Sequence, residues 1–454
     1  MYNFGRSVNS VVIPEYSESA VIESVIKAQK SEDSRKEAER KTAIEFYYNE
    51  NLDKHLEQWF AGESLQQVPT FPQRVVPRFA RARMMLYKQP PERLINGEVN
   101  DLYKEVAYKL NSKTRIFSEL SWLLGICHFK TSVDETRKRL NYEILPNVRE
   151  YIVSGETEPF AYSWEIAKDI TKKYYIFWSE DRDGFPGMHF MFDKAGKRFA
   201  IEGNPEMINP YGINPVSRVE HSSNAYDVVR ASVQIGIAMT EIALGVRFKL
   251  GQPVFTGIDE GQSKIKSGID NALVLPEGAS FNYVSPSGSI LEMIEAVKAF
   301  ANQTAENNHL RIRWGDSVGN APSGEALRIL EIENLESRTS DESLFREWEL
   351  ARYDIDRVVC EKHGLGIFPD SYVVDFEEVE FPLSPSEERA WLDWKLDKGI
   401  MTKKELLLYF NPDMNEDELQ AKLQEVSEEK RIEREETAPP RPTFGGLRNL
   451  GTTR

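Results

Sequence analysis

Apolar residues recur at helical spacing through much of the chain. In the stretch 101–125, Leu102, Val106 and Leu110 are four residues apart, and this interval predicts a helix. The preceding stretch, 71–95, is also predicted to be helical. Two consecutive prolines near its end force the chain into an extended exit.

The pattern changes between about 126 and 201. Here short runs of aromatic and β-branched residues alternate with turn residues, which predicts strands rather than helices. The clearest strands are Lys172–Trp178, Gly187–Phe192 and Arg198–Glu202.

A long helix is predicted from about Asn224 to Phe248. It is apolar nearly all round, so another surface must cover it. The stretch 251–288 is interrupted by glycines and holds small predicted strands, such as Asn271–Leu275 and Phe281–Val284. Because Ser289–Asn308 then reads as a second helix, we expect two helices with a compact β insertion at their far ends.

The remaining stretches are a loop at 313–323, a long charged helix at about 324–362, and short helices near the carboxyl end. Ser384 and Thr402 are predicted helix N-caps, because each is followed three residues later by a glutamate. The three short helices are predicted at Pro385–Asp397, Lys403–Tyr409 and Glu416 to about Glu435.

Both ends of the chain are predicted to lie outside the core. Ala20–Lys41 favours helix but is mostly charged, which indicates a solvated helix or a disordered leader. The last 17 residues, APPRPTFGGLRNLGTTR, are predicted to form a flexible tail.

Composition narrows the class of protein. With 454 residues, 40% of them hydrophobic, the chain can bury a core and is not a fully disordered protein. The most apolar stretch, Ala231–Val246, is shorter than the ~20 residues that span a bilayer and contains Glu241, so we expect no membrane helix. No signal peptide is visible at the amino terminus. Two cysteines cannot form a disulfide framework, which favours a reducing cytoplasm.

The net charge of −16 argues against a protein that holds nucleic acid, because phosphate binding depends on Lys and Arg. It does not exclude a protein that lets DNA pass without holding it. The acidic excess is concentrated in residues 376–436, which carry 18 Asp or Glu against nine Lys or Arg.

Motifs with a known chemical mechanism are absent from the sequence. It has no phosphate-binding loop, no dinucleotide fingerprint, no H-E-x-x-H, no nucleophile elbow and no paired C-x-x-C. The six histidines are far apart in sequence. We therefore expect no catalytic residues, no metal site and no cofactor.

The order of these pieces resembles the portal protein of tailed bacteriophages. Five stretches carry the resemblance, and their order along the chain is more specific than any one of them. They are RVVPRFARARMMLYKQPPERL, SELSWLLGICHFKTSV, NALVLPEGASFNYVSPSGSILEMIEAVKAFANQTA, GNAPSGEALRILEIENLESR with its Ser-Gly-x-Ala-Leu pattern, and LDKGIMTKKELLLYFNPDMNEDELQAKLQEVSEEK.

The resemblance implies an α+β, mainly α, portal fold with a wing, a helical stem, a small β-rich clip, a tunnel loop and a short helical crown. Carried onto this sequence, the parts are an amino-terminal arm at 1–41, the wing at 42–223, the first stem helix at 224–248, the clip at 249–288, the second stem helix at 289–312, the tunnel loop at 313–323, the long helix and return to the wing at 324–383, the crown at 384–436 and the tail at 437–454.

The implied function is a ring, usually of twelve subunits, at one capsid vertex of the virion, assembled in the host cytoplasm. Double-stranded DNA is packaged and ejected through the ring. The implied partners are the terminase large subunit, head-completion, adaptor or tail proteins, the major capsid and scaffolding proteins, and further copies of the chain, with no membrane.

Residue roles follow from the same resemblance. Arg313, Trp314, Asp316, Asn320 and Ala321 would lie at the narrowest part of the channel. The subunit interface of the stem would include Ile235, Met239 and Ile242. In the clip, Lys264 and Lys266 would face the motor or an adaptor.

Each role has an ordinary structural alternative. Trp314 would then pack on the following helix, Arg313 would pair with an acid, and the two clip lysines would be solvated. Two alternative functions also remain, namely another phage head or tail structural protein and a hydrolase with an unrecognised carboxylate site.

Overall fold

The protein is mixed α and β. The structure is a computed structural model and describes residues 10–30, 34–66, 68–166, 173–248, 252–256, 280–284, 290–311, 332–378, 385–411 and 414–437. It is 49% helical and 21% strand, as expected for a mainly helical α+β chain. The described residues form two compact units. The first holds those up to 311 together with 332–378, and the second holds those from 385 onward.

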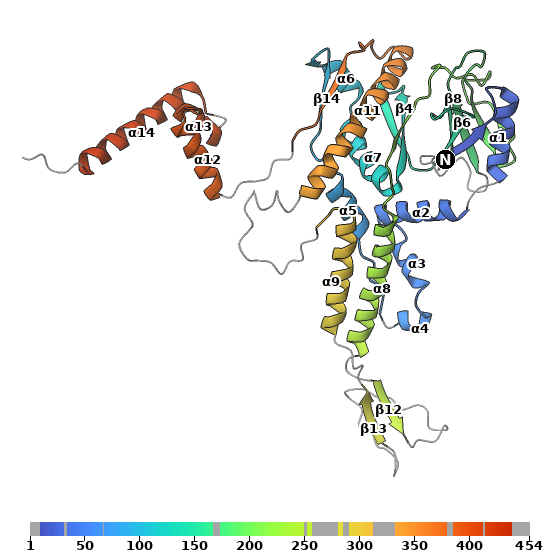
Figure 1. Cartoon of the computed structure of the whole chain (residues 1–454), viewed down its shortest axis with the longest axis horizontal. Helices are drawn as coiled ribbons and strands as arrows, with labels where there is room; N and C mark the ends of the chain where they lie inside the picture. The colour runs from blue at the N-terminus through green and yellow to red at the C-terminus, as the bar shows by residue number, and fades with distance from the viewer. Residues whose placement is uncertain are drawn as a thin grey trace, which may run out of the picture. The chain divides into compact units, whose positions relative to one another are not determined.

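A six-stranded sheet is built mostly from the aromatic region of the sequence (Figure 1). Its strands, in spatial order, are β1 (Ser10–Ile13), β6 (Val148–Val153), β7 (Ala161–Ile166), β8 (Tyr174–Ser179), β9 (His189–Asp193) and β10 (Arg198–Phe199). β1 is parallel to β6, and the other pairs are antiparallel. β8, β9 and β10 confirm the three predicted strands, and each observed end lies within three residues of the predicted one.

The prediction of a solvated or disordered amino-terminal arm is wrong for its described part. β1 adds a strand to the sheet, and α1 (Glu18–Lys30) packs beside it. Val21 and Val25 lie on one face of α1 and are buried in the same apolar cluster as Tyr151 and Phe177. The charged residues Glu18, Glu23 and Lys27 of α1 are exposed, and most other charges of the predicted arm follow the helix in the sequence.

Two three-stranded sheets and four short helices make up much of the rest of the first unit. The sheets are β11 (Val216–Glu220), β4 (Ile126–Asp134) and β5 (Arg139–Leu145), and then β14 (Tyr372–Asp375), β2 (Glu92–Ile95) and β3 (Glu98–Val99). The short helices are α3 (Leu52–Glu57), α4 (Gly62–Leu65), α5 (Val75–Arg83) and α6 (Asp101–Val106).

Two predicted helices are shorter than the sequence pattern indicated. α5 ends at Arg83, and β2 begins at Glu92, directly after the two prolines. The pattern at 101–125 is divided into α6, capped by the side chain of Asn100, and α7 (Leu110–Leu124). Gly125 ends α7 with a φ of 78° and would bring a Cβ within 3.1 Å of Asn224, so only glycine fits this turn.

The main core gathers buried side chains from α2 (Ser34–Tyr48), α5, α7, β4 and α11 (Ile332–Lys362) in one apolar cluster. Phe117 of α7 stacks on Trp348 of α11, with ring centroids 4.6 Å apart, and Phe129 of β4 meets the same indole edge-on. The indole nitrogen of Trp348 donates a hydrogen bond to Ser217. α11 confirms the predicted long charged helix over its described part.

A network of charges crosses this core at α11. Arg352 is fully buried and donates to Glu349 at 2.7 Å and to Asp356. Arg93 of β2 donates to the other oxygen of Glu349 at 2.6 Å. The charges of two cations and two carboxylates therefore cancel inside the core, where an unpaired charge would be costly.

Burial and pairing shift the two carboxyl groups in opposite directions. Burial would raise the pKa of Glu349, but the charges and hydrogen bonds of Arg93 and Arg352 outweigh it and hold that pKa well below its usual range. Burial raises the pKa of Asp356, although Arg352 and three hydroxyl groups oppose the shift. The hydroxyl donors to Asp356 are those of Tyr103, Tyr142 and Thr131.

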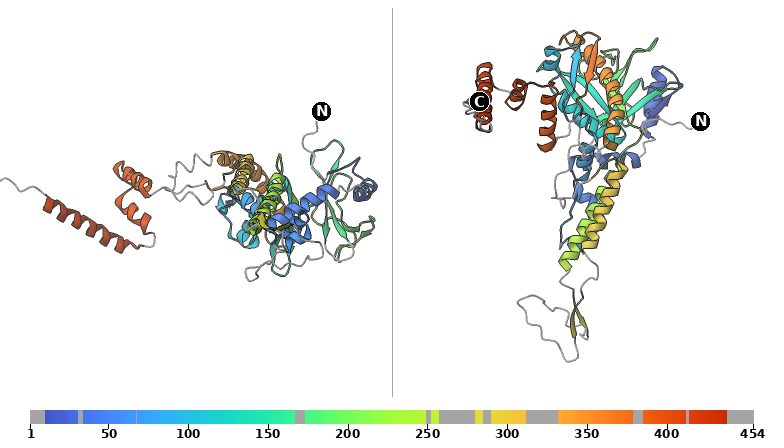
Figure 2. Two further views of the ribbon diagram at one scale, coloured as in Figure 1. Left: turned by 90° about the horizontal axis from the view of Figure 1, so that it is seen from below. Right: turned by 60° about the vertical axis from the view of Figure 1, so that its left-hand side comes forward.

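The second unit consists of α12 (Pro385–Asp397), α13 (Lys403–Phe410) and α14 (Glu416–Thr437). These bounds confirm the predicted helices within two residues. The capping box of Thr402 and Glu405 is present in both directions, as predicted. Ser384, the other predicted N-cap, lies outside the described residues. Further views are given in Figure 2.

Candidate functional site

Two long helices, α8 (Tyr226–Phe248) and α9 (Ile290–Asn307), lie side by side and run antiparallel (Figures 1 and 2). Asn308, directly after α9, donates a hydrogen bond to Asp227 in the first turn of α8 at 2.8 Å. At the other end of the pair, Ile242 and Met293 line one groove. The predicted helix pair is therefore present, with its connecting segment at the far end.

A β hairpin belongs to that connecting segment. β12 (Gln252–Thr256) pairs with β13 (Ser280–Val284) in antiparallel register. β13 contains the predicted strand 281–284, whereas the predicted strand 271–275 lies outside the described residues. Lys264 and Lys266 lie outside them as well, as do Arg313, Trp314, Asp316, Asn320 and Ala321 of the predicted tunnel loop.

α8 is covered on one side by a segment of the same chain. The backbone N–H of Phe71 donates to Thr240 at 3.0 Å, and Ser232 donates to the carbonyl oxygen of Gln73 at 2.8 Å. A Cβ at Gly236 would lie 2.9 Å from the side chain of Leu56, so this glycine permits close packing. These contacts lie on one face of α8 and leave α9 to cover another.

The structure changes the interpretation of Ile235, Met239 and Ile242. The sequence prediction assigned them to a contact that only neighbouring subunits would make dry. Ile235 and Ile242 are already 6% and 7% exposed in the single chain, and Met239 is half-buried. Part of the cover that the apolar helix needs is thus internal to the subunit.

Exposed apolar side chains remain on the helix pair. An apolar groove of about 430 Å³ runs between α8 and α9, with Ala296, Val297 and Phe300 on the α9 side. Phe300 is 44% exposed, Leu291 72% and Val246 54%. The sequence pattern does not show that these residues are exposed, because periodicity cannot show which face of a helix its own chain covers.

By length and composition alone, Tyr226–Arg247 could cross a membrane. Such a helix is also typical of a protein core, and 44% of the apolar window is buried in this chain. Its hydrogen bonds to Phe71 and Gln73 and its packing on α9 are contacts of a helix within a folded unit.

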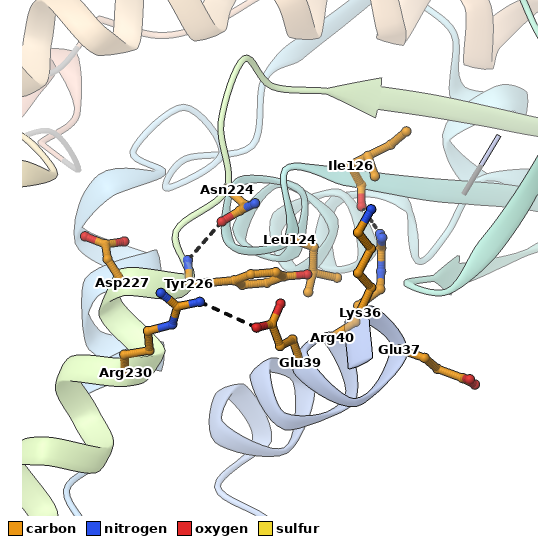
Figure 3. A pocket seen from close by; sticks show the side chains of 10 residues that line it. All are labelled: Lys36, Glu37, Glu39, Arg40, Leu124, Ile126, Asn224, Tyr226, Asp227 and Arg230. Atoms are coloured by element: carbon orange, nitrogen blue, oxygen red, sulfur yellow. Dashed lines mark hydrogen bonds and ion pairs between the residues drawn. The ribbon is translucent and has the colours of Figure 1, made fainter. Parts of the chain in front are cut away.

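A polar pocket of about 440 Å³ lies beside the first turn of α8 (Figure 3). Its lining combines three basic and three acidic side chains with Tyr226, Asn224 and apolar residues of α7 and β4. Arg230 of α8 and Glu39 of α2 form an ion pair at 3.5 Å, whereas Glu37 points away from the other side chains. Because its charges balance, the lining selects neither an anion nor a cation.

Arg40 is the buried charge of this pocket. Its guanidinium donates to the backbone carbonyl oxygens of Pro146 and Ile126, and burial lowers its pKa. These bonds tie α2 to the ends of β4 and β5. The pocket is best explained as a junction that holds α2, α8 and β4 together.

Buried histidines add polar contacts inside the first unit. His128 of β4 hydrogen bonds to Glu150 at 2.8 Å, and burial lowers its pKa. The neighbouring Cys127 is fully buried, and burial raises the pKa of its thiol to about 12. The thiol is therefore not an active nucleophile. Across the described stretches, no group of three or more His, Cys, Asp or Glu side chains could hold a metal ion.

We expect stability to fall in mild acid because of His221. Burial lowers the pKa of His221 from 6.5 to about 4, so below pH 6.5 the unfolded chain binds a proton that the folded chain does not. Its contribution is complete above pH 6.5 and is lost as the pH falls toward 4. Between pH 7 and pH 5 the loss is about 2 kcal/mol.

Urea unfolding at the two pH values measures this effect. His221→Gln should unfold with a smaller difference between pH 7 and pH 5 than the unmodified chain. Replacement of the exposed His309 by Gln is the matched control and should leave the difference unchanged. An equal difference for all three proteins would contradict the role of His221.

Comparison with known proteins does not assign a family. No family model matches the chain. A search of curated proteins gives no match either. Among solved structures, one match is a chain titled "Virion of native gene transfer agent (GTA) particle", with a TM-score of 0.39, 12% identity and coverage of 78% of this chain and 91% of that one. A TM-score of this size does not establish a common fold, so the functional assignment must come from the chain's own residues.

Proposed function

We propose that the chain is the portal protein of a phage-like particle. It forms a closed ring at one capsid vertex, and double-stranded DNA enters and leaves through the central channel. The observation that carries this proposal is the antiparallel pair α8 and α9, joined by a segment that holds a β hairpin and bearing exposed apolar residues from the hairpin end to about its middle.

The exposed apolar residues support assembly. Leu291, Phe300 and Val246 leave apolar area in water that a neighbouring copy would bury, at about 25 cal/mol per Å². When one face of each copy binds a different face of the next copy, the copies form a closed ring if the rotation between neighbours adds up to a full turn. The portal interpretation therefore assigns α8 and α9 to the stem and the hairpin to the clip.

The charge of the chain fits passage of DNA. A net charge of −16 repels phosphate, so a channel through a ring of such chains keeps the duplex mobile. In this proposal Arg313, Trp314, Asp316, Asn320 and Ala321 line the narrowest point, and Lys264 and Lys266 face the terminase large subunit or an adaptor. The subunit itself carries out no chemistry, and the terminase hydrolyses ATP.

The hydrolase alternative finds no support among the described carboxylates that are most buried. Glu150, Glu349 and Asp356 are each hydrogen bonded inside the core. None of the three lines the polar pocket or the apolar groove. A carboxylate held in this way stabilises the fold and does not meet a substrate.

Changing the proposed tunnel loop tests the channel. The double variant Trp314→Ala, Asp316→Ala should form rings of normal mass but package less DNA than the unmodified protein, measured as nuclease-protected DNA in an in vitro packaging reaction. The matched control is Ile367→Ala, which changes an 84% exposed residue and should leave both the mass of the rings and the amount of packaged DNA unchanged. Normal packaging by the double variant, or loss of its solubility, would contradict the loop assignment.

A further inference from the structure

The second unit exposes two tryptophans. Trp391 and Trp394 of α12 are 46% and 44% exposed, and their rings stack with centroids 5.1 Å apart and planes 7° apart. The ammonium group of Lys395 lies 4.9 Å from the centroid of Trp391. Large, rigid aromatic surfaces of this kind are enriched where proteins bind partners.

α13 extends this surface. Tyr409 donates a hydrogen bond to Glu388, one turn before Trp391 on α12, at 3.2 Å. Tyr409 and Phe410 are both more than half exposed and meet edge to face at 5.2 Å. We call Trp391, Trp394, Tyr409 and Phe410 the aromatic patch. The apolar residues that the unit does bury are others, including Leu392 and Leu419.

The sequence that follows α14 has the composition to bind such a patch. Residues 438–454 contain three prolines within four positions, at 439, 440 and 442. Proline-rich segments favour the extended polyproline II conformation and dock on aromatic surfaces at low entropic cost. Charge also favours this pairing, because 438–454 carry three arginines and no acid, whereas 385–437 carry 15 acids and nine bases.

The length of α14 decides which copy supplies the three prolines. α14 starts beside α13, where Glu416 pairs with Lys404 at 2.5 Å, and its 22 residues extend about 33 Å away from α12 (Figures 1 and 2). Five residues beyond Thr437 cover only about 16 Å at 3.1 Å per residue. The prolines therefore fall short of the patch of their own chain.

We propose that residues 438–454 of one copy bind the aromatic patch of a neighbouring copy. The neighbour comes from the ring of the proposed function, and the inference rests on that function to this extent. Each subunit is then linked to the next through a second contact, separate from α8 and α9. Prolines pack on the aromatic surface that the stacked indoles, Tyr409 and Phe410 leave exposed, and arginines meet the acidic side chains around them.

A labelled peptide of residues 438–454 tests this contact. Fluorescence anisotropy is measured against the full chain, both as single subunits and as assembled rings. The peptide should bind single subunits, and the variant Trp391→Leu, Trp394→Leu should bind at least about tenfold more weakly, a loss of about 1.4 kcal/mol. Rings should bind less peptide, because neighbouring copies already fill their patches.

Two controls make the result specific. Trp59→Leu removes a 58% exposed tryptophan from the first unit and should leave peptide binding unchanged. A peptide with alanine in place of the three prolines should bind more weakly than the native peptide.

Several outcomes would overturn the proposal. They are no binding to single subunits at 1 mM peptide, equal binding by the double tryptophan variant, and equal binding by rings and single subunits. Failure of the chain to form rings would contradict the portal function instead, and peptide binding to single subunits would still report on the patch.

Discussion

Replacing Arg352 with methionine should prevent stable folding of the first unit. The substitution leaves Asp356 fully buried without a cation, while Glu349 keeps Arg93. Removing one partner of a buried ion pair typically costs 3–5 kcal/mol, out of a total stability of about 5–15 kcal/mol. The expected result is aggregation on expression, or a urea midpoint far below that of the unmodified chain.

Two further variants separate the charge network from general effects of mutation. Arg357→Met removes a partly exposed arginine from the same helix, where it pairs with Asp354 and Asp370, and should cost less than about 1 kcal/mol. Adding Asp356→Asn to Arg352→Met should restore part of the stability, because a neutral amide replaces the unpaired charge. Equal urea midpoints for Arg352→Met and the unmodified chain would show that the network does not stabilise this core.

Replacing Leu291 with aspartate should leave the subunit folded and prevent formation of the proposed ring. Leu291 is 72% exposed on α9, so a charge there costs a single chain little. In a ring the same charge would be buried between subunits without a partner, at a cost of several kcal/mol for each contact. Light scattering should therefore give the mass of one subunit, and the urea midpoint should stay close to that of the unmodified chain.

Substitutions at two other positions serve as controls for this test. Ile235→Asp should lower the urea midpoint of the subunit itself, because Ile235 is buried within one chain. Ile367→Asp changes an 84% exposed residue far in sequence from α8 and α9 and should leave the ring intact. Rings of normal mass from Leu291→Asp would exclude this part of α9 from the subunit interface.

The sequence predicted those helices and strands whose formation depends on nearby residues. α8 follows from a run of mostly apolar residues, and α13 begins at a capping box formed within four consecutive residues. The strands β8 and β9 follow from aromatic runs between turns. In each case the signal lies within about ten residues of the element that it specifies.

Long-range pairing accounts for what the sequence could not show. β1 pairs with β6, 140 residues away, so a stretch that reads as a solvated arm becomes part of a sheet. Glu349, Arg352 and Asp356 have the spacing of charges on a solvated helix. Only their contacts with Arg93 and with tyrosines from other parts of the chain show that they are buried. Likewise, Ile235 could not be assigned to the inside of the subunit before α9 was placed beside α8.

The mass of the purified protein tests the central claim most directly. Size-exclusion chromatography with light scattering gives the mass, and negative-stain images of the same fraction give the symmetry. The portal account predicts a particle of about twelve subunits of 52.2 kDa each, with rotational symmetry and a central hole. A mass of 52.2 kDa at every concentration, with no ring in the images, would contradict it.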